Sequence, residues 1–109
     1  TKPTANQPSL LSLQEVTTLF HEFGHALHGL LSQCRYRSLA GTNVYWDFVE
    51  LPSQIMENWV FEEEGLKMFA EHYQTKEPIP QDWIKKIKDS NKFMAGYWSL
   101  RQVTFALLD

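Results

Sequence analysis

The sequence contains a single cysteine, Cys34, so no disulfide can form within the chain, which fits a reducing compartment. No apolar run approaches the roughly 18 residues of a membrane-spanning helix, and no basic segment precedes an apolar leader. Positive charge is not in excess, because 10 Lys and Arg stand against 13 Asp and Glu. These absences predict a cytoplasmic protein, with the periplasm left open, that binds neither membranes nor nucleic acids.

The sequence also lacks a glycine-rich phosphate loop, a convincing nucleophile triad and any internal repeat. Its 43% hydrophobic and 21% charged residues are typical of a globular protein, and its 109 residues of one domain. The chain begins without methionine and ends on an apolar helical pattern, with no terminating glycine or proline. We therefore expect it to be a segment of a longer protein.

The strongest helical pattern covers residues 12–33, after an irregular lead-in over residues 1–11. Ser12 and Glu15 form a capping-box pattern at its start, and the apolar pattern weakens after residue 31. Apolar residues recur at intervals of three and four: Val16, Leu19, Phe20, Phe23, Leu27, Leu30 and Leu31. On a helical wheel this stripe lies roughly opposite His21 and His25, so we expect the stripe to pack and the opposite face to present both imidazoles.

The sequence His-Glu-Phe-Gly-His at residues 21–25 has the H-E-x-x-H spacing of zinc metallopeptidases. Histidines one turn apart can bind a single zinc ion, and Glu22, beside the metal, could take a proton from a zinc-activated water. The motif alone is only moderately specific, since chance would produce it about once in a hundred such chains. A helix with two solvated histidines is the alternative that the motif alone leaves open.

A second helical pattern follows Asp47 and supplies candidates for a third zinc ligand. Glu50 precedes Pro52, which has no backbone donor, so Glu50 should lie in the first turn of a helix or at a kink. From there its carboxylate could be directed at the two histidines, completing the His, His, Glu set of some catalytic zinc sites. Glu57 and Glu15 are rival ligands, although Glu15 is expected to serve the capping box.

Two long motifs, His-Glu-Phe-Gly-His-Ala-Leu-His at 21–28 and Asp-Phe-Val-Glu-Leu-Pro-Ser-Gln at 47–54, resemble those of the thimet oligopeptidase family of zinc peptidases. This family includes oligopeptidase A and the peptidyl-dipeptidases, or dipeptidyl carboxypeptidases. The resemblance extends along nearly all of the chain, through Gly-Thr-Asn at 41–43, Glu-Asn-Trp at 57–59 and Arg-Gln at 101–102. Family members are much longer, mostly helical proteins, so the chain resembles only the segment around their zinc site.

The resemblance implies that His21, His25 and Glu50 bind one zinc ion and that Glu22 is the catalytic base. Residues 41–43 resemble the peptidyl-dipeptidase version of the loop, which favours release of C-terminal dipeptides from short peptides. Internal cleavage by an oligopeptidase is the first alternative, and a noncatalytic helical module with structural zinc is the second. The residues that steady the oxyanion in the family lie outside this chain. The isolated segment is therefore expected to be a poor enzyme, with the rest of the parent peptidase as a partner.

Other polar residues receive simpler interpretations. Cys34 is expected to be a buried or idle thiol rather than a zinc ligand. His28 is expected to support the site or the fold, because a fourth protein ligand would close a catalytic site. Ligating histidines usually donate their second ring nitrogen to an oxygen, for which Ser53, Gln54 and Glu57 are candidates. The acidic residues 62–64 and His72 are expected at the surface.

The predicted fold class is all-α, with several packed helices and an irregular loop or short hairpin between the two ligand-bearing helices. The H-E-x-x-H helix covers residues 12–33, and the loop covers residues 34–46. The third-ligand helix and a following helix cover residues 47–75, and C-terminal helices cover residues 80–109. The prolines at 78 and 80 mark the break before this last part.

Overall fold

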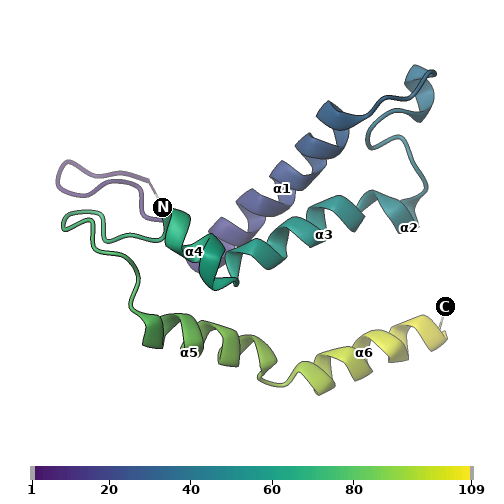
Figure 1. Ribbon diagram of the computed structural model, residues 1–109. Coiled ribbons are helices and arrows are strands. Elements are labelled where there is room, and N and C mark those ends of the chain that lie inside the picture. The colour runs from purple at the N-terminus through teal and green to yellow at the C-terminus, as the bar shows by residue number, and fades with distance from the viewer. Residues whose placement is uncertain (1, 109) are drawn as a thin grey trace. The chain divides into compact units, whose positions relative to one another are not determined.

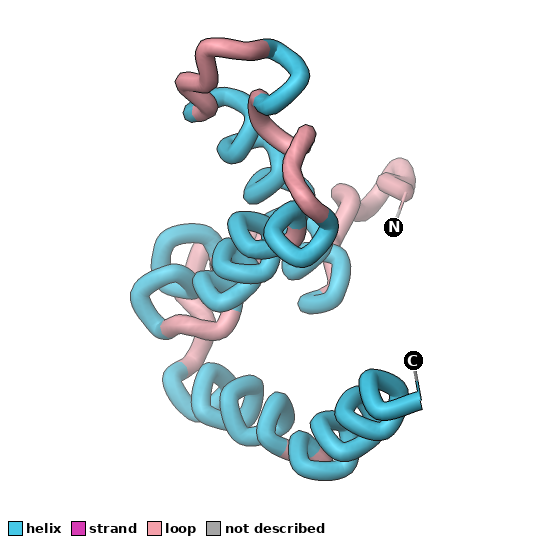
Figure 2. The backbone as a smooth tube through the Cα atoms, turned by 90° about the vertical axis from the view of Figure 1, so that its right-hand side faces the viewer, coloured by secondary structure: helices cyan, strands magenta, loops and turns pink. Residues whose placement is uncertain are grey.

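The computed structural model describes residues 2–108, and every regular element in that range is helical. The elements are α1 (Leu13–Leu31), the 3₁₀ helix η1 (Arg37–Leu39), α2 (Trp46–Val49), α3 (Leu51–Glu57), the 3₁₀ helix η2 (Asn58–Val60), α4 (Glu63–Phe69), α5 (Gln81–Lys92) and α6 (Ala95–Leu108). Figure 2 shows helices and loops but no strand, so the predicted all-α class is confirmed. Among residues 2–108, no helix is both long and apolar enough to cross a bilayer.

Contacts divide the chain into two units, Thr1–Met68 and Phe69–Asp109, and each is described by itself. The first unit is built on α1, which begins as the capping box predicts. The Glu15 backbone N–H donates to the Ser12 hydroxyl, and the Glu15 carboxylate accepts from the Ser12 backbone N–H at 2.7 Å. This second hydrogen bond is the main reason why the pKa of Glu15 is lowered to about 2.

Residues 32–45 form a loop with one 3₁₀ turn, and the hairpin that the sequence left possible does not form. The loop folds back onto the end of α1, where the Gly41 backbone N–H donates to the Ser32 hydroxyl at 3.0 Å. Gly41 has a φ of +58°, and a Cβ there would lie 3.1 Å from the Gly29 Cα. Glycine therefore suits position 41 for both its conformation and the close approach to α1.

After the loop, α2 leads into α3 through Glu50, which is the N-cap residue of α3. Pro52 lies in the first turn of α3, where its missing N–H costs no helical hydrogen bond. Helices α1 and α3 lie side by side (Figure 1), and they make the most extensive packing between elements in this unit. Gly24 is buried at this contact, where a Cβ would lie only 2.5 Å from the Ser53 Cα.

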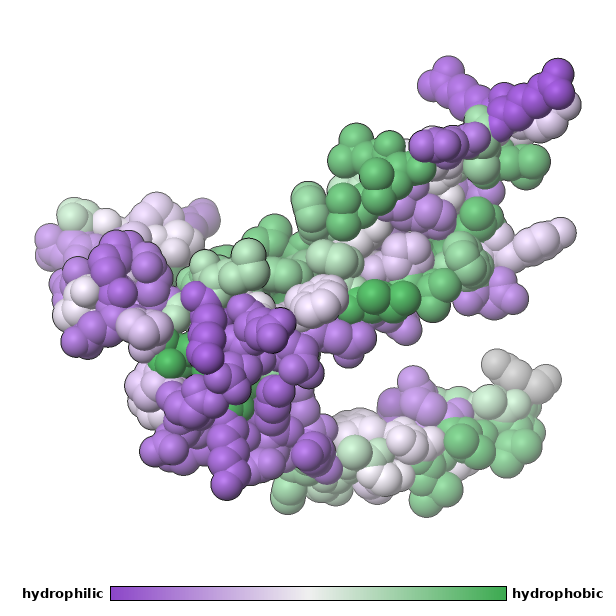
Figure 3. Space-filling view, viewed as in Figure 1, coloured by the Kyte–Doolittle hydropathy of each residue, from purple (hydrophilic) through white to green (hydrophobic). Residues whose placement is uncertain are grey.

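The expectation that the apolar stripe of α1 would be its packed face is wrong within the described residues. The exposed fractions are 57% for Leu19, 52% for Phe23 and 77% for Leu30, and Figure 3 shows apolar residues at the surface along α1. The face that packs on α3 is instead the one that carries His21, Gly24 and His25. Glycine allows the two backbones to approach there, whereas much of the stripe stays exposed and Val16, Phe20 and Leu27 are only half-buried.

The first unit continues through η2 and α4. Val60 and Leu66 are buried, with exposed fractions of 0% and 2%, and they form the apolar core at this end of the unit. Gly65 sits against the Trp59 carbonyl, where a side chain would collide with the backbone. The core therefore lies beside the α1–α3 pair and depends on a tight turn between η2 and α4.

The helical region predicted for residues 47–75 ends earlier, at Phe69, the last residue of α4. Residues 70–80 form a turn in which the His72 N–H donates to the Glu77 carbonyl and the Ile79 N–H to the Ala70 carbonyl. Pro78 and Pro80 follow, and neither can continue a helix. This local hydrogen bonding replaces the helix that apolar spacing alone predicted.

The two C-terminal helices are separated by Phe93, the extended C-cap residue of α5, and by Met94, which has a φ of 57°. Ile84 is the buried anchor of α5, with an exposed fraction of 3%. All described residues of α6 are exposed. The apolar pattern at the end of the sequence therefore does form a helix, but not a packed one within this chain.

Candidate metal centre

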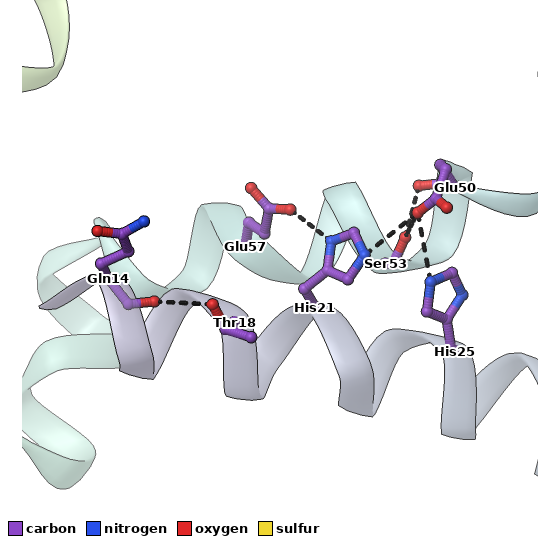
Figure 4. A network of polar contacts seen from close by, with 7 residues as sticks. All are labelled: Gln14, Thr18, His21, His25, Glu50, Ser53 and Glu57. Carbon is purple, nitrogen blue, oxygen red and sulfur yellow. Dashed lines mark hydrogen bonds and ion pairs between the residues drawn. The ribbon is translucent and has the colours of Figure 1, made fainter. Parts of the chain in front are cut away.

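Helix α1 presents His21 and His25 toward the start of α3, where Glu50 lies (Figure 4). The Glu50 Oε2 atom lies 3.2 Å from the His21 Nε2 and 3.3 Å from the His25 Nε2. The two imidazole rings meet edge to face, with centroids 4.9 Å apart. The structure thus brings together the three residues that the sequence predicted as metal ligands.

The geometry of this group fits a zinc ion. Bonds of about 2.0–2.1 Å directed to the corners of a tetrahedron place neighbouring ligand atoms about 3.3–3.4 Å apart. The two distances from the Glu50 Oε2 to the histidine Nε2 atoms, 3.2 and 3.3 Å, are close to that spacing. All three ligand atoms lie within 4.8 Å of one another. Among residues 2–108, these three side chains form the cluster that could bind a metal ion.

Glu57, the first rival for third ligand, contacts the other side of His21. Its Oε1 lies 2.6 Å from the His21 Nδ1, and an ionised carboxylate can only accept, so Nδ1–H donates. This hydrogen bond is the main reason why the pKa of His21 is raised, with smaller contributions from Glu50 and Glu22. In the neutral ring the proton on Nδ1 leaves the Nε2 lone pair facing Glu50.

In the neutral ring, that arrangement leaves two acceptors, the His21 Nε2 and the Glu50 Oε2, facing each other at 3.2 Å, whereas the protonated ring that the raised pKa favours would donate Nε2–H to the carboxylate. Two lone pairs in contact repel unless a proton or a metal cation lies between them. A metal ion satisfies both, and the carboxylate on the far side of an imidazole is the usual partner of a ligating histidine. The donor set therefore suits a bound cation.

Ser53 is the second residue that contacts the group from α3. Its hydroxyl lies 2.8 Å from the Glu50 Oε2 and 2.9 Å from the Glu50 carbonyl oxygen. From the sequence, Ser53 and Glu57 were two of three candidates for supporting the ligands, and the structure gives them different partners. Gln54, the third candidate, is exposed.

Glu22, the predicted base, is an exposed residue of α1 between the two histidines in sequence. The remaining candidates lie outside the group of three. Glu15 is engaged in the capping box, and Cys34 is exposed. His28 packs edge to face against Phe48, with ring centroids 6.1 Å apart, and its Nδ1 is buried without a hydrogen-bond partner among the described residues.

Of the four residues predicted at the surface, namely Glu62, Glu63, Glu64 and His72, all but Glu63 are exposed. His72 is exposed, and its Nδ1 accepts a hydrogen bond from the Thr75 backbone N–H at 3.2 Å. Glu62 and Glu64 are exposed, while Glu63 is half-buried and pairs with Lys67 across one helical turn. None of them belongs to the group that could hold a metal.

Two histidines one turn apart on one helix, with a glutamate from a second helix, form the donor arrangement of zinc peptidases with His, His, Glu sites. Over residues 1–109 the sequence matches the model of Peptidase family M3, and the chain belongs to that family. Together with relatives named oligopeptidase A and dipeptidyl carboxypeptidase, this match confirms the predicted resemblance to that group.

Named relatives cover nearly the whole chain. Oligopeptidase A of Haemophilus influenzae is 47% identical over 108 residues, which is 98% of this chain and 16% of the relative. Dipeptidyl carboxypeptidase of Escherichia coli is 44% identical over 99% of this chain and 16% of its own length. The organellar oligopeptidase A of Arabidopsis thaliana is 46% identical over 100% of this chain and 14% of its own length. The chain thus spans about a sixth of the length of these relatives.

Proposed function

We propose that this chain is the zinc-binding segment of a metallopeptidase that hydrolyses short peptides, with one zinc ion held by His21, His25 and Glu50. The observation that carries the proposal is the position of one carboxylate oxygen, the Glu50 Oε2, at 3.2 and 3.3 Å from the Nε2 atoms of both histidines. Membership of a peptidase family supports the reaction class. Short peptides and the remainder of the full-length polypeptide are the proposed partners, and the cytoplasm is the proposed location.

When bound, zinc supplies a Lewis acid for the scissile carbonyl and lowers the pKa of a water molecule to about 7. The chain's own contribution to the proton transfers comes from Glu22. In the proposed mechanism the Glu22 carboxylate accepts the proton of the attacking water and then delivers it to the amine that leaves. Glu22 is exposed on α1, where a substrate can approach it.

The alternative of a noncatalytic module with structural zinc is less well supported. Structural zinc sites are closed and rich in cysteine, whereas this group has three protein donors and the one cysteine lies outside it. Three protein donors leave one tetrahedral position open, and Glu22 provides a carboxylate adjacent in sequence to a ligand. Both features favour a catalytic centre.

A zinc site with two histidines and a glutamate does not determine which peptide bond of the substrate is hydrolysed. We propose release of C-terminal dipeptides, on the basis of the Gly-Thr-Asn sequence at 41–43, which the fold places in the loop next to the end of α1. Internal cleavage of short peptides is the second candidate. Its specific support is the 47% identity to oligopeptidase A, which is comparable to the 44% identity to dipeptidyl carboxypeptidase.

The test uses the full-length protein and its Glu22→Gln variant, with hydrolysis of a short N-blocked peptide followed by mass spectrometry. We expect Glu22→Gln to lose about 10²–10⁴-fold in kcat while retaining zinc, because the substitution removes the base but no ligand. Glu64→Gln, which changes an exposed glutamate on α4, should alter neither quantity. Hydrolysis at the wild-type rate by Glu22→Gln would refute the role of Glu22. The masses of the products distinguish dipeptide release from internal cleavage.

A further inference from the structure

Ser53 is the one completely buried polar side chain among the described residues, with an exposed fraction of 0%. It lies in the first turn of α3, where its Cα faces Gly24 of α1 at a close approach of the two helices. A buried side chain next to a close helix–helix contact has few accessible rotamers. The Ser53 hydroxyl is therefore more rigidly positioned than the hydroxyl of an exposed serine.

The hydroxyl of Ser53 contacts the same oxygen that faces the histidines. The Glu50 Oε2 lies 2.8 Å from the Ser53 Oγ, 3.2 Å from the His21 Nε2 and 3.3 Å from the His25 Nε2 (Figure 4). The carboxylate and the Glu50 carbonyl oxygen, 2.9 Å away, can only accept, so the hydroxyl donates, and its single proton is shared between these two acceptors. A carboxylate oxygen has room for such a donor while a second lone pair remains available to a cation.

Glu50 needs this restraint because its side chain is 47% exposed and has three rotatable bonds. It is the N-cap residue of α3, yet it makes no capping hydrogen bond with its side chain. Without a fixed donor, water would compete for the carboxylate and several rotamers would be accessible. The hydrogen bond from Ser53 selects the rotamer in which Oε2 faces both imidazoles.

We propose that Ser53 is a positioning residue for the third metal ligand, acting through Glu50 to pre-organise the zinc site. This inference rests on the proposed zinc site. The Ser53 hydroxyl contacts Glu50 and not the histidines, so its effect on the metal passes through the Glu50 carboxylate. The competing interpretation is a buried serine that stabilises only the start of α3, through the 2.9 Å contact with the Glu50 carbonyl oxygen.

The experiment compares zinc affinity and the visible spectrum of the Co²⁺-substituted form in the full-length protein and in Ser53→Ala. We expect zinc affinity to fall about 10–100-fold, as for other residues that orient metal ligands, and the Co²⁺ absorption bands to change in position and intensity. Thr18→Val is the matched control. The Thr18 hydroxyl bonds the Gln14 carbonyl on the helix that carries both histidines, so its loss should leave affinity and spectrum unchanged.

A double-mutant cycle separates positioning from general stability. If Ser53 acts through Glu50, the Ser53→Ala change should have no further effect on zinc affinity in a Glu50→Ala background, measured at zinc concentrations high enough to load two histidines. An equal loss in that background, or wild-type affinity and spectrum in the single Ser53→Ala variant, would overturn the inference and leave the zinc site intact. Failure of the wild-type protein itself to bind zinc would overturn both this inference and the proposed function.

Discussion

Replacing Gly24 with alanine tests whether the close packing of α1 on α3 sets the geometry of the metal group. The added Cβ would lie 2.5 Å from the Ser53 Cα and 2.7 Å from the Pro52 carbonyl oxygen. Both neighbours are backbone atoms, which cannot rotate away as the end of a side chain can. Ordinary contact begins at 3.4 Å, so the two helices must separate locally by about 0.9 Å, the difference between 3.4 and 2.5 Å.

The effect on the metal group should exceed the effect on stability. Overpacking costs about 1–3 kcal/mol, and the higher helix propensity of alanine returns about 1 kcal/mol, so we expect a net loss of about 0–2 kcal/mol. Glu50 starts α3 and moves with it, which would lengthen its 3.2 and 3.3 Å distances to the histidines to about 4 Å. A tetrahedral zinc site cannot span that separation without distortion, and zinc affinity should fall at least about tenfold.

The assay is zinc binding by competition with a chromophoric chelator, alongside thermal unfolding of the metal-free full-length protein. Gly29→Ala is the matched control on the same helix, because a Cβ at position 29 meets no atom within 4 Å. This control should keep wild-type zinc affinity and gain up to about 1 kcal/mol in stability. Gly24→Ala with zinc affinity equal to wild type would refute the reasoning that Gly24 sets the distance between ligands.

Three further predictions concern individual residues. Glu57→Gln replaces the charged acceptor at the His21 Nδ1 with a neutral one, so zinc affinity should fall about tenfold by chelator competition, with little change in helix content by circular dichroism. Met94→Gly should raise the free energy of unfolding by about 0.5–1 kcal/mol in denaturant titrations, because φ is 57° there, whereas Met68→Gly in the exposed face of α4 should lower it by about as much. Glu15 has its pKa lowered from 4.5 to about 2, so its stabilising contribution is present above pH 4.5 and is lost as the pH falls toward 2. The stability difference between wild type and Glu15→Gln should therefore shrink over that range, and a constant difference would contradict the assignment.

The start of α1 was predictable because its determinants are local. A serine followed three residues later by a glutamate satisfies the free N–H groups of a first helical turn, and the structure has both hydrogen bonds of that pattern. The three residues of the metal group could also be predicted from the sequence. A spacing of four brings His21 and His25 to one helix face, and Pro52 places Glu50 at the start of a helix. These features depend on neighbours in sequence and on a single helix–helix contact.

The packed face of α1 was not predictable from apolar spacing. Apolar side chains mark a face that can be buried, but they do not say what buries it, and here Leu19 and Phe23 remain more than half exposed. The signal that could have located the contact is Gly24, a glycine in the middle of a helix between two predicted ligands. A glycine in the middle of a helix lowers helix stability, so its presence there indicates that another backbone approaches closely at that position.

The second half of the chain departs from its predicted pattern for a different reason. Lys76 and Met94 adopt positive φ values of 62° and 57°, and no residue type at these positions announces a turn. The helix predicted up to residue 75 ends at Phe69 because backbone hydrogen bonds of the following turn, such as Ile79 N–H to the Ala70 carbonyl, replace helical ones, whereas α5 begins directly after Pro80 as the proline pattern indicates.

The central claim is that Glu50, and not Glu57, completes a zinc site with the two histidines. The most direct test is the zinc content and zinc affinity of the full-length protein beside its Glu50→Gln and Glu57→Gln variants. We predict one zinc per wild-type chain, a loss of more than about a hundredfold in affinity in Glu50→Gln, and only about a tenfold loss in Glu57→Gln. Unchanged affinity in Glu50→Gln, or the larger loss in Glu57→Gln, would contradict the account.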